Sequence, residues 1–190
     1  AAIYTLGPTG LMAPAGDAGG AARRFLTAFA PVYGLNEADM AGLALEERPG
    51  LAGGREVVVT EAVSGRRLYG ARLRVHFASD GEFVAAAGTL YGGLRWEGGE
   101  KLSPDEAWSR ARAFAAKLTG AGAGDADGEG VHPGVGADAA AEIDAMEVVA
   151  YPLGDVARLA WVVTTVAAPN GVDRFEMVVD AVDGRILEVV

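Results

Sequence analysis

The side chains in this sequence that could carry out chemistry are few and poorly grouped. Its two histidines, His76 and His132, stand far apart, and no H-E-x-x-H pattern places two imidazoles and a carboxylate on one helix face. His76 falls on the expected solvent side of a strand. His132 falls in a glycine-rich acidic segment that offers no rigid support for a general base. The sequence therefore excludes an ordinary zinc-peptidase site.

The acidic residues do not supply an alternative site. Residues 125–129 read Asp-Ala-Asp-Gly-Glu, which is similar to the start of a calcium loop, but the glycine is misplaced and no glutamate follows at the twelfth position. The carboxylates of Glu46 and Glu47 are sequence neighbours rather than a pair facing each other in a cleft. Phosphate-binding and nucleophile-elbow motifs are missing. We therefore predict a non-catalytic protein with no catalytic residue, no metal site and no cofactor.

The bulk composition narrows the class of partner. The 190 residues carry 16 basic and 26 acidic side chains, a formal net charge of -10. Nucleic-acid binding requires clustered Lys and Arg that neutralise phosphates, so no nucleic-acid partner is expected. No apolar run reaches the ~20 residues that a membrane span requires, and there is no cysteine for disulfides. We expect a soluble protein that is cytosolic, or secreted with a signal peptide absent from this chain.

Antiparallel strands form the expected framework of the first half of the chain. Between Glu56 and Leu94, three apolar runs are separated by turn signals at Ser64-Gly65 and Ser79-Asp80-Gly81, a pattern typical of a meander. Side chains alternate along the second strand, so the core face is predicted to carry Ala71, Leu73, Val75 and Phe77, and the solvent face Arg72, Arg74 and His76.

A helix is expected to cover this sheet. Apolar residues recur at spacings of three and four residues from Ala22 to Tyr33. Gly34 follows at the position expected for a left-handed helix cap. Residues 1–17 have no sustained period, which predicts a flexible leader. The first module is therefore expected to span residues 18–95.

The second half repeats this order of elements. After a glycine-rich linker at 96–102, Ser103 is a predicted N-cap, with Pro104 at the first helical position and Glu106 closing a capping box. Residues 119–145 are low in complexity and are predicted to be a mobile acidic insertion. Four apolar runs follow, at 146–151, 159–166, 175–179 and 186–190. We therefore predict an α+β fold of two tandem modules, each a helix packed on an antiparallel sheet, with the second at 103–190.

The segment EAVSGRRLYG at residues 61–70 resembles the propeptide motif of the fungalysin and thermolysin families, which reads Gln, any residue, Tyr, Asn, Gly, Val, Pro, Val, Phe, Gly. Four residues fit this pattern: Gly65, Leu68, Tyr69 and Gly70. Four others depart from it: Glu61, Val63, Arg66 and Arg67. The two cations stand at the hairpin tip, where the family is apolar.

The resemblance continues along roughly residues 20–190. The helix at 25–35 looks like the family's N-terminal helix. The helix start at 102–107 and the closing stretch at 175–187 look like the PepSY module that follows in those families. The order of these pieces carries the resemblance, which implies a cystatin-like second module.

The resemblance implies the proregion of a secreted zinc metallopeptidase, which inhibits the peptidase domain and assists its folding. The alternative is a free-standing secreted PepSY-type binding or protease-inhibitor module. Both imply a secreted or periplasmic location. The expected partner is the cognate peptidase catalytic domain. The expected partner-binding residues lie in the hairpin and the C-terminal strand, near the implied processing site: Gly65, Arg66, Arg67, Tyr69, Gly70, Ile186, Leu187, Val189 and Val190.

Overall fold

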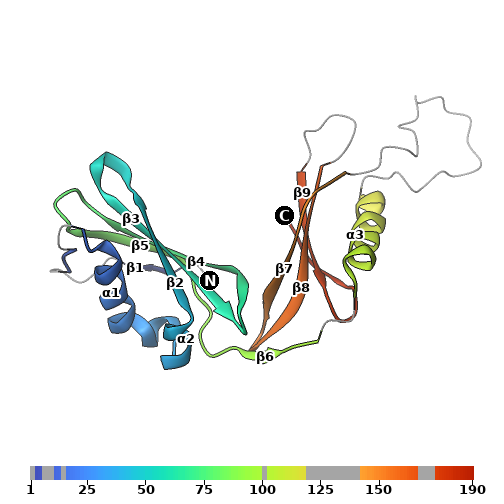
Figure 1. Cartoon of the computed structure of the whole chain (residues 1–190), viewed down its shortest axis with the longest axis horizontal. Coiled ribbons are helices and arrows are strands. Elements are labelled where there is room, and N and C mark those ends of the chain that lie inside the picture. Colours follow the sequence, from blue (N-terminus) through green and yellow to red (C-terminus); the bar gives the residue numbers. More distant parts are fainter. Residues whose placement is uncertain (1–2, 6–10, 14–15, 100–101, 119–141, 167–173) are drawn as a thin grey trace, which may run out of the picture. The chain divides into compact units, whose positions relative to one another are not determined.

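The structure, a computed structural model, describes residues 3–5, 11–13, 16–99, 102–118, 142–166 and 174–190. These residues form three α-helices and ten strands, so the predicted α+β class is confirmed (Figure 1). The helices are α1 (Ala18–Tyr33), α2 (Glu37–Ala41) and α3 (Pro104–Leu118). The strands are β1 (Ile3–Thr5), β2 (Leu43–Pro49), β3 (Arg55–Val63), β4 (Arg66–Phe77), β5 (Phe83–Thr89), β6 (Arg95–Glu97), β7 (Glu142–Leu153), β8 (Val156–Val166), β9 (Arg174–Asp180) and β10 (Ile186–Val189).

The chain divides into two compact units. Unit 1 contains residues 1–96 and 150–157, and unit 2 contains residues 97–149 and 158–190. Residues 150–157 carry the turn between β7 and β8, so a short piece of the second half of the sequence belongs to unit 1.

Unit 1 is built on an antiparallel sheet whose strands follow the order β2, β3, β4, β5 and β1. The strands β3, β4 and β5 are the three predicted between Glu56 and Leu94, and both predicted turns are present. The alternation predicted along β4 is also confirmed. Its core-facing residues, Ala71, Leu73, Val75 and Phe77, are buried. Arg72 and Arg74 on the other face are exposed, and His76 is half-buried.

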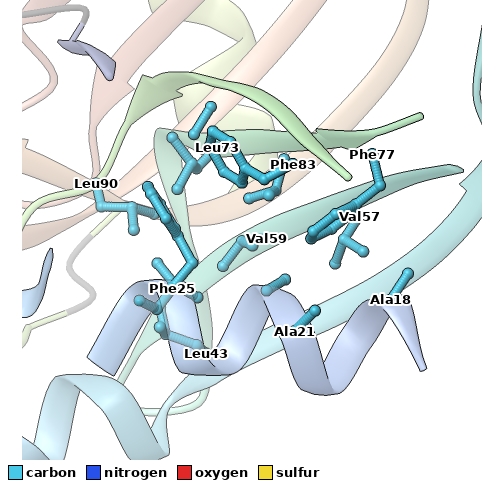
Figure 2. Packing of buried hydrophobic residues seen from close by; sticks show 14 of the residues in the cluster. Ala18, Ala21, Phe25, Leu43, Val57, Val59, Leu73, Phe77, Phe83 and Leu90 are labelled. Carbon is cyan, nitrogen blue, oxygen red and sulfur yellow. The ribbon is translucent and has the colours of Figure 1, made fainter. Parts of the chain in front are cut away.

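The helix α1 supplies the other half of the unit 1 core. It begins after Asp17, whose side chain accepts a hydrogen bond from the Gly20 N–H at 2.9 Å, and it ends at Gly34, which adopts a left-handed φ of 69°. Figure 2 shows Ala18, Ala21 and Phe25 on this helix facing the sheet. The Phe25 ring stacks on the Phe83 ring, with centroids 5.1 Å apart. Aromatic stacking and aliphatic burial therefore hold α1 against β3, β4 and β5.

The N-terminal segment differs from the predicted flexible leader. Ile3–Thr5 pair antiparallel with β5, and the backbone of Ala13 donates to the carbonyl of Gly81 at 2.7 Å. Ala13 is buried in the unit 1 core. Without β1, β5 would present an unpaired edge, and its backbone groups gain partners from this segment. A three-residue strand has too few side chains to show a period, so the sequence pattern did not reveal it.

In unit 2 the helix α3 begins as predicted. Ser103 and Glu106 form the capping box: the Ser103 N–H donates to Glu106 Oε2 at 2.8 Å, and the Glu106 N–H donates to Ser103 Oγ at 3.3 Å. The Ser103 N–H and the Ser103 hydroxyl both donate to the Glu106 carboxylate, and these two bonds lower the pKa of Glu106. Small residues, Ala107, Ala111 and Ala115, are buried along one side of the helix. The strands β8, β9 and β10 are antiparallel neighbours, and β7 lies beside β8.

Two predicted boundaries are wrong. The expected linker at 96–102 contains part of the short strand β6, which pairs with β8, and the Arg95 N–H donates to the carbonyl of Asp155 at 3.0 Å. The acidic insertion was expected to reach residue 145, but β7 already begins at Glu142. The first error arises because β6 pairs with β8, a strand far along the sequence. Residues 119–141 lie outside the described residues.

Candidate partner-binding surface

The β3–β4 hairpin has a two-residue tip. Ser64 and Gly65 adopt φ values of 50° and 73°, and Val63 lies opposite Arg66 in the register. Positive φ at both central positions is the signature of a type I′ turn, which matches the twist of the flanking strands. The strand residues that follow the turn, Arg66 and Arg67, are exposed. The hairpin therefore presents two guanidinium groups from a well-defined backbone.

A bulge interrupts the register between this tip and the rest of the sheet. Thr60 lies opposite Arg72, whereas Ala62 lies opposite Arg67, so the stretch around Gly70 faces Glu61 alone. Gly70 has a φ of 71°, which a side chain would strain. The shift also turns Leu68 into a second small core with Ala71, Ala150 and Ala157. Gly70, one of the four residues that fit the propeptide motif, thus has a structural role at this bulge.

Tyr69 lies beside this second core rather than projecting freely. Its ring packs on the ring of Tyr151 with centroids 5.7 Å apart and planes tilted by 31°. Tyr151 belongs to the part of β7 that is included in unit 1. Tyr69 is half-buried, so only part of its ring is available to a partner.

Glu61 is a site residue that was not predicted from the sequence. This side chain is only 2% exposed, and its Oε2 accepts a hydrogen bond from the Tyr91 N–H at 2.8 Å. Burial raises the pKa of Glu61 to about 7, the Tyr91 hydrogen bond opposes this increase, and the charge of Asp39 adds to it. The position could have been found from the strand period, because 57, 59 and 61 share the core face of β3.

A second carboxylate, that of Asp39, binds the same backbone segment at Tyr91–Gly93. Asp39 Oδ2 accepts from the Gly93 N–H at 2.8 Å and from the Asn36 N–H at 2.9 Å. Together, Glu61 and Asp39 fix the backbone that follows β5. The two groups are an acidic pair around Tyr91–Gly93, and protonation of Glu61 relieves their repulsion.

The C-terminal candidates belong to unit 2, and the hairpin candidates belong to unit 1, so the structure divides the predicted residues into two sets. Ile186, Leu187 and Val189 lie on β10, with a register shift between Ile186 and Glu188. Val190 continues the pairing, because its N–H and C=O each bond to Glu176 at 2.9 Å. The side chain of Val189 is 38% exposed and that of Val190 is 68% exposed. Both are accessible to a partner.

A buried aspartate precedes β10. Asp180 is fully buried, and its Oδ1 accepts from the Val182 N–H at 2.7 Å. Its Oδ2 lies 3.6 Å from Arg158 Nη1 and 4.0 Å from Arg185 Nη2. A hydrogen bond to Glu97 raises the pKa of Arg158, which remains charged beside the buried carboxylate.

The face of the unit 1 sheet opposite α1, called the outer face below, carries charged residues. Glu46, Glu56, Arg72, Arg74 and His76 lie on it. Glu46 accepts two hydrogen bonds from Arg48, at 2.9 and 2.7 Å, which lower the pKa of Glu46. His76 Nδ1 lies 3.5 Å from Glu56 Oε2. The outer face is therefore a polar surface with one largely buried aliphatic side chain, Val58.

An apolar groove opens at one end of the outer face. It has a volume of about 390 Å³ and is lined by Leu51, Ala52, Arg55, His76, Phe77, Ala78, Ser79 and Val84. Leu51 is 91% exposed and Val84 is 54% exposed, which is unusual for large apolar side chains. This outer-face groove was not predicted from the sequence.

Neither the described side chains nor the comparisons with known proteins identify a metal site or a family. Across the described part of the chain, no three His, Cys, Asp or Glu side chains gather closely enough to hold a metal ion. The sequence motif at 125–129 and His132 lie outside that part. No helix among the described residues is both long and apolar enough to cross a membrane. The chain matches no protein-family model and no curated protein sequence.

Proposed function

We propose that this chain is the proregion of a secreted zinc metallopeptidase, and that it inhibits the peptidase domain and assists its folding. The observation that carries the proposal is the order of the pieces that resemble such proregions: the helix, the Ser64–Gly70 hairpin, the capped helix and the closing strand. Folded together, the first two form unit 1, and the last two belong to unit 2.

The surface chemistry supports binding to a folded partner. The hairpin tip is a tight two-residue turn followed by Arg66 and Arg67, and unit 1 adds an outer face with an apolar groove. A preformed surface loses little conformational entropy on binding, so packing and charge complementarity translate into affinity. An inhibitor and folding template needs only such a surface, without a reacting group of its own.

Refolding tests the proposal. A denatured zinc metallopeptidase domain of the thermolysin type is diluted into buffer with and without an equimolar amount of this chain, and recovered proteolysis is measured after the chain is removed. The chain should increase the recovered activity. The control is Val59→Asp, which places a charge at a fully buried core position and unfolds unit 1. Equal recovery with the chain, the control or buffer alone would contradict a chaperone role.

The attached peptidase domain is a separate test. If the reading frame after Val190 continues into an H-E-x-x-H motif, the chain acts in cis on that domain. A stop codon there would instead favour the free-standing inhibitor module.

A further inference from the structure

Every charged side chain on the strand β4 is basic. Residues 66–77 include four arginines and one histidine, and no aspartate or glutamate. Arg72 lies between Thr60 and Thr89 in the register, and Arg74 lies between Val58 and Ala87. No carboxylate therefore lies directly across from either arginine on a neighbouring strand.

The carboxylates closest to this row already have partners. Glu46 forms two hydrogen bonds with Arg48, and Glu56 lies beside His76. Neither Arg72 nor Arg74 forms an ion pair with another described residue. Each of these two exposed guanidinium groups can donate two parallel hydrogen bonds to one carboxylate.

The outer-face groove lies at the end of the same row. His76 belongs both to the row Arg72, Arg74, His76 and to the groove lining. The lining contains apolar side chains with Arg55 and His76 but no acidic residue. Ala52 has a φ of 51°, which is unfavourable for a residue with a Cβ atom, and the adjacent Leu51 is 91% exposed. Backbone strain of this kind is enriched at functional sites, so this loop marks the end of the row as a candidate contact.

From this geometry we infer that the outer face of unit 1 seats an extended acidic segment of the peptidase partner. An apolar side chain of that segment occupies the outer-face groove, and carboxylates two and four residues away bind Arg74 and Arg72. Alternate residues along a strand are about 7 Å apart, so the side chains of an extended segment have the same spacing as the row on β4. This inference rests on the proposed function and names the chemistry of the contact.

Four variants in two matched pairs test the inference, using the full chain and a mature zinc metallopeptidase of the thermolysin type. Arg74→Glu reverses a charge on the outer face, and Arg23→Glu reverses an exposed charge on α1, on the other side of the sheet. Val84→Ser replaces an apolar side chain of the groove with a polar one. Val32→Ser makes the same replacement on α1, away from the groove, at a valine that is 55% exposed compared with 54% for Val84. The inhibition constant is measured by residual proteolysis, and melting temperatures confirm that each variant is folded.

The inhibition constant should rise about tenfold for Arg74→Glu and about fivefold for Val84→Ser, and change by less than about twofold for both α1 variants. Raising NaCl from about 50 to about 300 mM should weaken inhibition by the natural chain more than inhibition by Arg74→Glu, because screening removes the charge contribution. If the natural chain inhibits and all four variants inhibit equally, the outer face is not the contact, while the proposed function stands. If the natural chain does not inhibit at all, the proposed function fails and this inference fails with it.

Discussion

Replacing Glu61 by glutamine should change how the stability of this protein depends on pH. In the folded chain, burial raises the pKa of Glu61 from 4.5 to about 7. The folded state therefore binds a proton more tightly than the unfolded state does. The stability that protonated Glu61 contributes is complete below pH 4.5. It is lost as the pH rises towards 7, where the buried group becomes charged.

The size of the effect follows from the two pKa values. Each tenfold change in proton affinity corresponds to about 1.4 kcal/mol, so the free energy of unfolding can fall by up to about 3 kcal/mol over this range. We expect about 1 to 2 kcal/mol, because local relaxation admits water to a charged buried group. Glutamine keeps an oxygen for the Tyr91 N–H and cannot ionise. Glu61→Gln should therefore be more stable than the natural chain at pH 8 and nearly equal to it at pH 4.5.

Urea unfolding from pH 4.5 to 8 measures this difference. The control is Glu46→Gln, which removes an exposed carboxylate whose pKa is lowered, not raised, by its hydrogen bonds with Arg48. The control should follow the natural chain across the range. The reasoning is refuted if Glu61→Gln shows the same dependence of unfolding free energy on pH as the natural chain.

Three further predictions concern the stability of the two units, each measured by urea unfolding. Gly65→Ala should cost about 1 kcal/mol, because the turn requires a φ of 73°; no loss would argue against the type I′ turn. Asp180→Asn should cost about 2 kcal/mol by leaving Arg158 without its buried partner, whereas Asp155→Asn, at a carboxylate that is 82% exposed, should be neutral; equal effects would contradict the assigned burial. Phe25→Ala should cost about 3 to 4 kcal/mol, because its ring is 1% exposed in the unit 1 core, and a loss below about 1 kcal/mol would contradict that packing.

Local chemistry was sufficient to predict several elements of the fold. The Ser103–Glu106 capping box, the left-handed cap at Gly34 and the Ser64-Gly65 turn each depend on residues a few positions apart. The alternation of arginine and aliphatic residues along β4 gave the buried face correctly. These features are readable because side-chain period and backbone conformation are set by neighbouring residues.

Features that depend on distant partners were not predictable in the same way. The pairing of Ile3–Thr5 with β5 and the inclusion of residues 150–157 in unit 1 arise from contacts across much of the chain. The bulge that isolates Glu61 depends on a register shift, which no composition pattern reports. The outer-face groove likewise forms only when the loop at Leu51 and the strand residue Val84 come together.

The most direct test of the central claim is a titration of a mature zinc metallopeptidase of the thermolysin type with the purified full chain, with residual proteolysis as the readout. The proregion account predicts that proteolysis falls in a saturable manner as the chain is added, and that the Val59→Asp chain has no effect. Undiminished proteolysis up to a large molar excess of the folded chain would contradict the account.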